Sequence, residues 1–297
     1  PPPPSLLALG DALGRGRGPR GTLALMQAAP AVAAHALALR RLLHSLRPAL
    51  VRSNDLKGHV LAAWTAPRDA RVVWHLHDYV SDRSTIQALL RRSASSRVKV
   101  VAVSRSVADD VARTLQGRLS PEAIRVVWNR VDLERFRPPL DDDEARADAA
   151  WLDDLAGLPA IPGRRLRVGL IAAHARWKGQ EVVLDAARLV EAQVPGACRW
   201  FLVGGPIYAA EGSQHQTESL RARAGELGLP PDLVGFTGHL ADPARAYRGL
   251  DLIVHASTRP EPFGRTLIEA AACGRPVLTS ALGGAGEVAA ALGAAAV

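Results

Sequence analysis

Short apolar runs alternate with helix-like segments along most of this chain. Each run is a few residues long and is bounded by Gly, Pro, Asp or Ser, which is typical of strands in a buried parallel sheet. The segments between the runs place apolar residues at helical spacing. The predicted strands are 49–52, 71–76, 98–103, 124–128, 167–173, 200–203, 233–238, 250–256 and 276–280. The predicted helices are 28–46, 55–64, 84–93, 104–115, 181–191, 219–227, 244–250 and 266–273.

This alternation predicts an α/β protein with two Rossmann-like parallel sheets. A proline run and the string GRGRGPRG make residues 1–21 a low-complexity lead, which we expect to be disordered. Residues 22–137 form the first predicted domain. Residues 138–165 contain PP, DDDE and LPAIPGRR, and we interpret them as the linker between the domains. Residues 166–297 form the second predicted domain.

The composition fits a two-domain protein of a reducing compartment. With 297 residues, 48% of them hydrophobic, the chain is long enough for two cores. No apolar run approaches the ~20 residues needed to cross a bilayer. Two cysteines, Cys198 and Cys273, are too few for a disulfide framework. We therefore expect a cytoplasmic location.

The net charge of +8 leaves several functions open. It could reflect binding to nucleic acid, to an anionic membrane or to phosphorylated substrates, or only an arginine-biased composition. No nucleic-acid-binding motif is visible, and aromatic residues make up only 4% of the chain, too few for base-stacking platforms. We therefore expect no nucleic-acid partner. An arginine-rich nucleic-acid or membrane-surface binder stays open as an alternative.

Residues 259–277, RPEPFGRTLIEAAACGRPV, carry the first candidate site. They join a predicted strand to a predicted helix, and open α/β sheets bind ligands at such carboxyl ends of strands. Glu261 lies in the loop, and Gly264 permits the turn that leads into the helix. The unpaired N–H groups at the start of that helix suit a phosphate. We therefore expect a phosphate group beside Gly264, Arg265 and Thr266.

The two glutamates of this stretch extend the prediction to sugars. Glu269 could accept hydrogen bonds from both hydroxyls of a ribose, and Glu261 from hydroxyls of a second sugar. A diphosphate with one carboxylate for each sugar describes a nucleotide-sugar. The alternative is that Glu269 only pairs with Arg265 at i, i+4, which is worth about 0.3–0.5 kcal/mol, and that Glu261 is solvated.

Two further clusters follow predicted strands. The string HARWKGQ places Arg176 and Lys178 in a loop before a helix, where they could hold a diphosphate or form a solvated basic turn. The string HLHD follows the strand 71–76. His75 and His77 would point to opposite faces if the strand persisted, so only one would serve a site, unless a histidine is simply buried beside Asp78. No spacing supplies a third ligand, so we predict no metal site.

The string EPFGRTLIEAAACGRPV resembles the E-x7-E segment of family 4 retaining glycosyltransferases, which have the GT-B fold. HARWKGQ resembles the R-x4-K-G segment of that family, with Ala173 where the arginine usually stands, so that Arg176 would substitute for it. Gly-rich segments at 204–206 and 283–287 are also similar. A first strand with its Gly-rich loop and a closing helix are not recognisable, so we expect the chain to lack terminal segments of the family.

The resemblance implies two domains that face each other across a cleft. It implies a retaining, metal-independent hexosyltransferase that uses a nucleotide-diphosphate sugar, with UDP or GDP as the favoured nucleotide, and no other cofactor. The acceptor would be a sugar, a lipid-linked sugar, a polysaccharide of the cell envelope or a small molecule, with peripheral contact to the inner face of the membrane. A non-catalytic nucleotide-binding relative is the alternative.

The resemblance also assigns roles to residues. His77, with less weight His75, would face the donor sugar and the acceptor, and Glu261 would hold the donor sugar. Lys178 would stabilise charge on the leaving diphosphate, and Glu269 would hold the ribose. The residues implied in binding the donor are Arg176, Lys178, Gly264, Arg265, Thr266 and Glu269, and those implied in catalysis are His77, Glu261 and Lys178.

Overall fold

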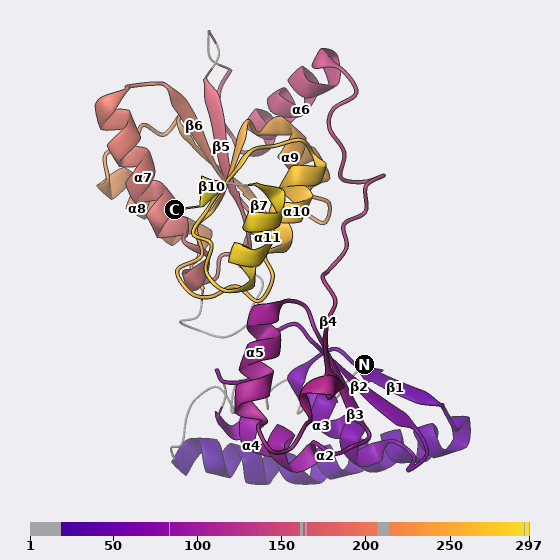
Figure 1. The fold of residues 1–297 in the computed structure, drawn as a ribbon. Helices are drawn as coiled ribbons and strands as arrows, with labels where there is room; N and C mark the ends of the chain where they lie inside the picture. The colour runs from indigo at the N-terminus through magenta and orange to yellow at the C-terminus, as the bar shows by residue number, and fades with distance from the viewer. Residues whose placement is uncertain are drawn as a thin grey trace. The chain divides into compact units, whose positions relative to one another are not determined.

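The computed structural model describes residues 19–82, 84–160, 163, 165–206, 214–293 and 295–296. It divides into two compact units, Pro1–Trp128 and Asn129–Val297. Each unit contains one sheet in which all strands run parallel (Figure 1). The predicted fold class, two parallel-sheet α/β domains, is therefore confirmed.

Among the described residues, the first unit has four strands that lie side by side in chain order (Figure 1). The strands are β1 (Leu50–Ser53), β2 (Arg71–Leu76), β3 (Val98–Ala102) and β4 (Ile124–Val126). The helices are α2 (Pro19–Leu46), α3 (Leu56–Thr65), α4 (Ser84–Ser93) and α5 (Arg105–Thr114), with a 3-10 turn, η1, at Pro121–Ala123.

Side-chain caps start two of these helices. The side chain of Asp55 accepts hydrogen bonds from the backbone N–H groups of Lys57 and Gly58 at the start of α3. Ser104 caps α5 by accepting a hydrogen bond from the N–H of Val107.

The helices of the first unit lie on one face of its sheet. Three successive right-handed crossovers in the same direction, β1 to β2 to β3 to β4, place α3, α4 and α5 on the same side. On that side Val72, Trp74 and Leu76 of β2 are buried. On the other side Arg71 is exposed and Val73 is only partly buried. The core of this unit therefore lies between the sheet and α3–α5, and the opposite face is open among the described residues.

The second unit has a doubly wound sheet with the strand order β10-β9-β8-β5-β6-β7. Its strands are β5 (Leu166–Ile171), β6 (Cys198–Val203), β7 (Val234–Gly238), β8 (Leu252–His255), β9 (Val277–Thr279) and β10 (Ala295–Ala296). Its helices are α6 (Asp142–Leu155), α7 (Gln180–Gln193), α8 (Thr217–Glu226), α9 (Ala244–Gly249), α10 (Arg265–Ala272) and α11 (Gly284–Leu292), with a 3-10 turn, η2, at Arg176–Lys178.

Helices cover both faces of this second sheet. Figure 1 shows α7 and α8 on one side of the strands and α6, α9 and α10 on the other. The first side packs Leu170, Leu202 and Phe236 against α7 and α8. On the other side, the side chain of Leu250 fills the space that a Cβ at position 169 would occupy, so Gly169 allows this close packing. The chain reverses its direction of winding between the neighbouring strands β5 and β8, which is the topological switch point where such sheets bind ligands.

Two predicted boundaries differ from the structure. The units divide after Trp128, before the predicted boundary at 137, because Phe136 packs edge-on against Tyr247 of the second unit. The predicted linker 138–165 contains α6, whose Asp148 is buried between Arg245 and Arg248 of α9. The acidic run that suggested a linker forms the first turn of α6, where carboxylates complement the helix dipole.

The structure also differs from the prediction near both ends of the described residues. Helix α2 begins at Pro19, so residues 19–21 of the predicted disordered lead are helical. Residues 1–18 lie outside the described residues. Helix α11 begins at Gly284, directly after Gly283, and was not predicted.

Candidate functional site

The loops that follow β5 and β8 meet at the switch point of the second sheet, and each brings one predicted site residue. Nζ of Lys178, after β5, donates a hydrogen bond to Oε2 of Glu261, after β8, over 2.6 Å. The two side chains are only 22% and 14% exposed. Oγ of Ser257 also donates to Oε2 of Glu261, over 3.1 Å. Glu261 is therefore not a solvated loop residue.

The backbone holds these loops together. The Gly179 φ angle is +81°, and a Cβ there would lie 2.0 Å from the carbonyl oxygen of Ala256, so only glycine allows this close approach. The N–H of Thr258 donates to the carbonyl of Trp177 over 2.8 Å. Lys178 is thus fixed beside the loop that carries Glu261.

A third loop, which follows β9, supports Glu261 from another direction. The N–H of Glu261 donates to the carbonyl of Leu282 over 3.0 Å, and the N–H of Gly284 donates to the carbonyl of Glu261 over 2.8 Å. The Gly-rich segment 283–287 therefore positions the backbone of Glu261 and starts α11 at the same point.

The environment of Glu261 keeps its carboxyl ionised. Burial alone would raise its pKa, but the nearby His255 and the charge and hydrogen bond of Lys178 outweigh burial and lower the pKa to about 2. His255 Nε2 lies 3.7 Å from Glu261 Oε2. At neutral pH the pair is a carboxylate beside an ammonium group.

Helix α10 begins at Arg265, one residue before the predicted start. Gly264 precedes it with a φ angle of +85°, and a Cβ there would lie 3.2 Å from Cβ of Ala285, so glycine suits the turn. Oγ1 of Thr266 lies 3.5 Å from the carbonyl oxygen of Ile171, at the end of β5. The predicted phosphate-binding residues Gly264, Arg265 and Thr266 are therefore at the same edge of the sheet as Lys178.

Glu269, in the middle of α10, is held by two side chains. Its Oε1 accepts from Arg265 over 2.8 Å, which is the i, i+4 pairing considered as an alternative. Its Oε2 accepts from the hydroxyl of Tyr247 over 2.8 Å. Tyr247 was missed by sequence reasoning, because it lies on α9 and no local spacing relates it to Glu269.

Arg176 lies in η2, the same turn as Lys178. Burial is the main cause that lowers the pKa of His215, and the positive charge of the nearby Arg176 lowers it further. Ala173, at the position where the resemblance expects an arginine, contributes only its carbonyl, which accepts from the side-chain amide of Gln180 over 2.8 Å. The role of Arg176 in binding a phosphate stays a prediction.

His75 and His77 belong to the first unit, and they lie side by side. Strand β2 ends at Leu76, so the alternation of faces stops there. The ring centroids are 4.1 Å apart, and Nε2 of His77 lies 3.2 Å from Nδ1 of His75. Burial, then the charges of His77 and Arg52, lower the pKa of His75 to about 4.

A third histidine, His59 on α3, was not predicted as part of this cluster. Its Nδ1 lies 2.7 Å from Oγ of Ser53, and its ring stacks on Trp74. Burial is the main cause that lowers the pKa of His59 to about 4, and the nearby His77 and His75 add to it. The cluster is therefore uncharged at neutral pH at His59 and His75.

The described residues contain neither a metal-binding cluster nor a membrane-spanning helix. No group of three or more His, Cys, Asp or Glu side chains there is arranged to hold a metal ion. Among the same residues, no helix combines the length and apolar character that crossing a bilayer requires.

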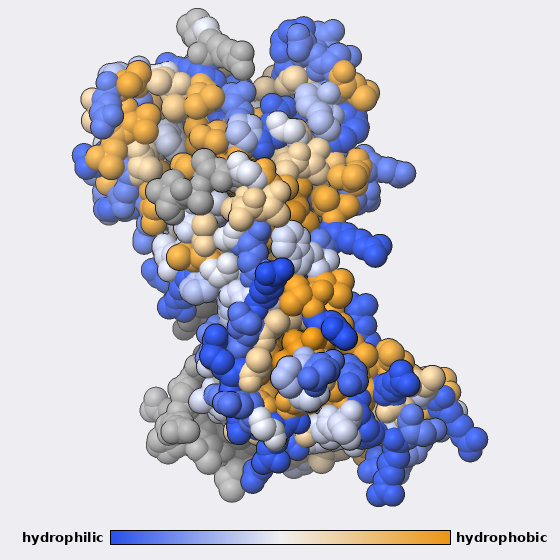
Figure 2. Space-filling model, viewed as in Figure 1, coloured by the Kyte–Doolittle hydropathy of each residue, from blue (hydrophilic) through white to orange (hydrophobic). Residues whose placement is uncertain are grey.

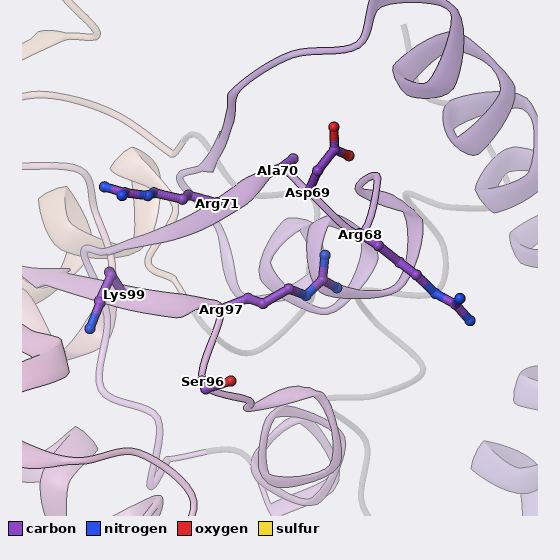
Figure 3. Close-up of a pocket in the computed structure, with 7 residues that line it drawn as sticks. All are labelled: Arg68, Asp69, Ala70, Arg71, Ser96, Arg97 and Lys99. Atoms are coloured by element: carbon purple, nitrogen blue, oxygen red, sulfur yellow. The ribbon is translucent and has the colours of Figure 1, made fainter.

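A basic pocket of about 390 Å³ lies in the first unit, where β2 and β3 begin (Figure 3). Arg68 and Arg71 point away from each other in this view. The guanidinium of Arg97 is held by hydrogen bonds to the carbonyls of Pro67 and Ala63. The pocket lies at the amino ends of the strands, whereas the predicted site residue His77 follows a carboxyl end. It is therefore separate from the predicted site.

Two families match the chain. The model described as Glycosyltransferase Family 4 matches residues 6–135, and the model described as Glycosyl transferases group 1 matches residues 165–294. Together they cover most of the chain.

Curated relatives include two bacterial enzymes. The D-inositol 3-phosphate glycosyltransferase of Jonesia denitrificans is 34% identical over 168 residues, which are 55% of this chain and 37% of the relative. D-inositol 3-phosphate glycosyltransferase 1 of Catenulispora acidiphila is 35% identical over 170 residues, 56% of this chain and 37% of the relative. The chain thus spans little more than a third of the length of these relatives.

Solved structures with the same fold include HepE of Anabaena in complex with UDP and glucose. Its TM-score is 0.69 at 24% identity, and the match covers 95% of this chain and 78% of HepE. Sucrose-phosphate synthase of Thermosynechococcus elongatus has a TM-score of 0.66 at 21% identity, covering 88% of this chain and 62% of that enzyme.

Proposed function

Because models of two glycosyltransferase families match this chain at 6–135 and 165–294, we propose that it transfers a sugar from a nucleotide-diphosphate sugar to a hydroxyl acceptor with retention of anomeric configuration. The observation that carries the proposal is the contact between Lys178 and Glu261 at the switch point, beside the start of α10. HepE in complex with UDP and glucose supports UDP as the nucleotide.

In this proposal the leaving diphosphate lies against Lys178 and the first N–H groups of α10. The ammonium group of Lys178 has three N–H donors, and Glu261 occupies one of them. Positive groups that are already in place stabilise charge as it develops on the leaving oxygen, without reorganisation. Arg176, Gly264, Arg265 and Thr266 complete the diphosphate site.

The carboxylates then hold the two sugars. Glu261 stays ionised because its pKa is about 2, so it can accept from donor-sugar hydroxyls at neutral pH. Glu269 accepts from the ribose. His77 serves the acceptor hydroxyl, and the low pKa of its neighbour His75 supports an uncharged environment there.

The remaining parts of the proposal concern metal, location and acceptor. We propose that no metal is required, because Lys178 and the helix start supply positive charge to the diphosphate. Two free, buried cysteines support a cytoplasmic location. The acceptor is a sugar, a lipid-linked sugar, a polysaccharide or a small hydroxyl compound, and the names of the inositol 3-phosphate glycosyltransferase relatives support the last of these.

A binding experiment tests the proposal. Thermal shifts with UDP-, GDP- and ADP-sugars, each with and without EDTA, should show stabilisation by one donor that EDTA does not remove. Lys178→Met should weaken binding of that donor by about 10- to 100-fold, because a hydrogen bond to a charged group contributes roughly 1.5–3 kcal/mol. Lys57→Met, the same change in the first unit, should leave donor affinity unchanged.

Three outcomes contradict parts of this proposal. No stabilisation by any donor would overturn the donor assignment, and stabilisation that EDTA abolishes would overturn metal independence. Donor binding without transfer or donor hydrolysis would instead favour a non-catalytic nucleotide-binding protein.

A further inference from the structure

Tyr247 is a fully buried side chain with a specific polar contact. It lies on α9, has no exposed surface, and its hydroxyl donates to Oε2 of Glu269 over 2.8 Å. A buried phenol hydroxyl needs a hydrogen-bond partner, and here the partner is the carboxylate to which the proposed function assigns the ribose.

The position of Tyr247 is itself fixed by packing. Its ring lies edge-on to Phe136 with centroids 5.8 Å apart. On the same helix, Arg245 and Arg248 each contact the buried carboxylate of Asp148 on α6 over 2.6 Å. The hydroxyl of Tyr247 therefore reaches Glu269 from a rigid part of the unit.

The other partner of Glu269 holds it less firmly. The side chain of Arg265 is 68% exposed, and exposed i, i+4 pairs of this kind stabilise a geometry only weakly. The side chain of Glu269 is only 11% exposed, so a ligand can approach it from few directions. The rotamer of Glu269 is thus set mainly by Tyr247.

The phenol keeps its proton at physiological pH. Burial, then the charge of Glu269 and the hydrogen bond to it, raise the pKa of Tyr247 well above its ordinary value. The hydroxyl therefore donates to Glu269 throughout the pH range in which the protein would work. Each carboxylate oxygen of Glu269 can accept a further hydrogen bond.

We propose that Tyr247 is a positioning residue that orients the Glu269 carboxylate to accept both hydroxyls of a ribose, and that this contact sets the selectivity of the site for ribonucleotides over deoxyribonucleotides. The inference rests on the proposed function, because it takes Glu269 as the ribose-binding residue. A carboxylate free to rotate would bind one hydroxyl about as well as two, so loss of its orientation should reduce selectivity.

Isothermal titration calorimetry on the full chain tests the inference. The probes are UDP, 2′-deoxy-UDP and 3′-deoxy-UDP, or the matching set for GDP or ADP if that diphosphate binds most tightly. We expect the unaltered protein to prefer the ribonucleotide by about tenfold or more, since the lost hydrogen bond is to a charged group. Tyr247→Phe should reduce this preference to about threefold or less, mainly by weakening the ribonucleotide.

The choice of variants separates a positioning role from a structural one. Tyr247→Phe removes one oxygen and keeps the ring on Phe136. A purely structural role would weaken all three nucleotides equally and leave their ratio unchanged. Tyr79→Phe is the matched control, because it removes a hydroxyl that lies 2.9 Å from Oγ of Ser106 in the first unit, and it should change neither affinity nor ratio.

Glu269→Gln distinguishes failure of the inference from failure of the proposed function. If Glu269→Gln lowers the ribose preference and Tyr247→Phe does not, the positioning role of Tyr247 is wrong and the ribose assignment stands. If neither variant changes the preference, the ribose assignment of Glu269 is wrong and the inference falls with it. Absence of nucleotide binding by the unaltered protein overturns both.

Discussion

In the second unit every residue of β6 is buried, whereas in the first unit β2 and β3 bury only alternate side chains. The cause is the strand order. Successive strands of the first sheet are added in one direction, so right-handed crossovers place their helices on one face. The second sheet is extended in both directions from β5, so its helices cover both faces.

The two units also differ in net charge. Residues 1–128 contain 19 Lys and Arg against 8 Asp and Glu, and residues 129–297 contain 18 against 21. The excess of positive charge therefore belongs to the first unit, which also has the open sheet face. Figure 2 shows apolar surface between polar side chains over the strands of that unit.

Most of the positive net charge lies away from the proposed donor site. The proposed donor site lies in the second unit, whose charge is slightly negative, so a few placed cations such as Lys178 serve the diphosphate and the overall basicity does not. The basic residues on the open face, Arg52, Arg71, Lys99 and Arg125, are exposed. We propose that an anionic membrane would contact the chain at these residues, and vesicle binding that weakens as salt is raised would support such contact.

The largest expected effects are in β6, where neighbouring residues face opposite covered sides. Phe201 and Leu202 are both fully buried. We expect Phe201→Ala to lower the free energy of unfolding by about 3–5 kcal/mol and Leu202→Ala by about 2–5 kcal/mol, because each leaves a cavity. Urea unfolding followed by circular dichroism measures both. A cost below about 1 kcal/mol for either would mean that one face of this sheet is not closely packed.

Burial lowers the pKa of histidines in both units, of His59 in the first and of His174 and His215 in the second, so acid should weaken both units. The pKa of His59 falls from 6.5 to about 4 on folding, so its contribution to stability is complete above pH 6.5 and is lost as the pH falls through 4. The pKa of Glu261 falls from 4.5 to about 2, so its contribution is lost only between those values. Full protonation of His59 should lower the free energy of unfolding by about 3 kcal/mol, since a shift of one pKa unit corresponds to 1.36 kcal/mol.

Pepsin cleavage mapped by mass spectrometry at stepwise lower pH measures the contribution of His59. Fragments from residues 1–128 should increase as the pH falls from 6.5 to 4. His59→Gln removes the titrating group and should make cleavage of the first unit less dependent on pH between 6.5 and 4. An unchanged pH dependence of that cleavage in His59→Gln would contradict the assignment of this window.

The strands and most helices could be predicted because local apolar patterns determine them. The same patterns could not show which sheet is covered on both faces. The run 98–103 is apolar except at Lys99 and was interpreted as a buried strand, yet Lys99 is exposed and Val101 is only partly buried. Coverage depends on strand order, which is a long-range property.

In the candidate site, too, the features set by local sequence could be predicted and those set by long-range contacts could not. Lys178, Glu261 and the start of α10 could be predicted because each directly follows a recognisable strand or loop. Tyr247 and α6 could not, because Tyr247 contacts Glu269 from another helix and Asp148 finds its arginines on α9. The HLHD string was interpreted through strand alternation, which stops at Leu76 and lets both rings meet.

The smallest expected effect is on the open face, and it tests the comparison most directly. Val100 and Val101 are neighbours in β3, and Val100 is fully buried beneath the helices while Val101 lies on the open side. Val100→Thr buries a hydroxyl and should cost about 1–3 kcal/mol, whereas Val101→Thr should stay within about 0.5 kcal/mol. Both substitutions keep a β-branched side chain, so strand propensity is matched. Equal costs in urea unfolding would show that the second face of this sheet is covered in solution, because only a dry contact makes the added hydroxyl unfavourable.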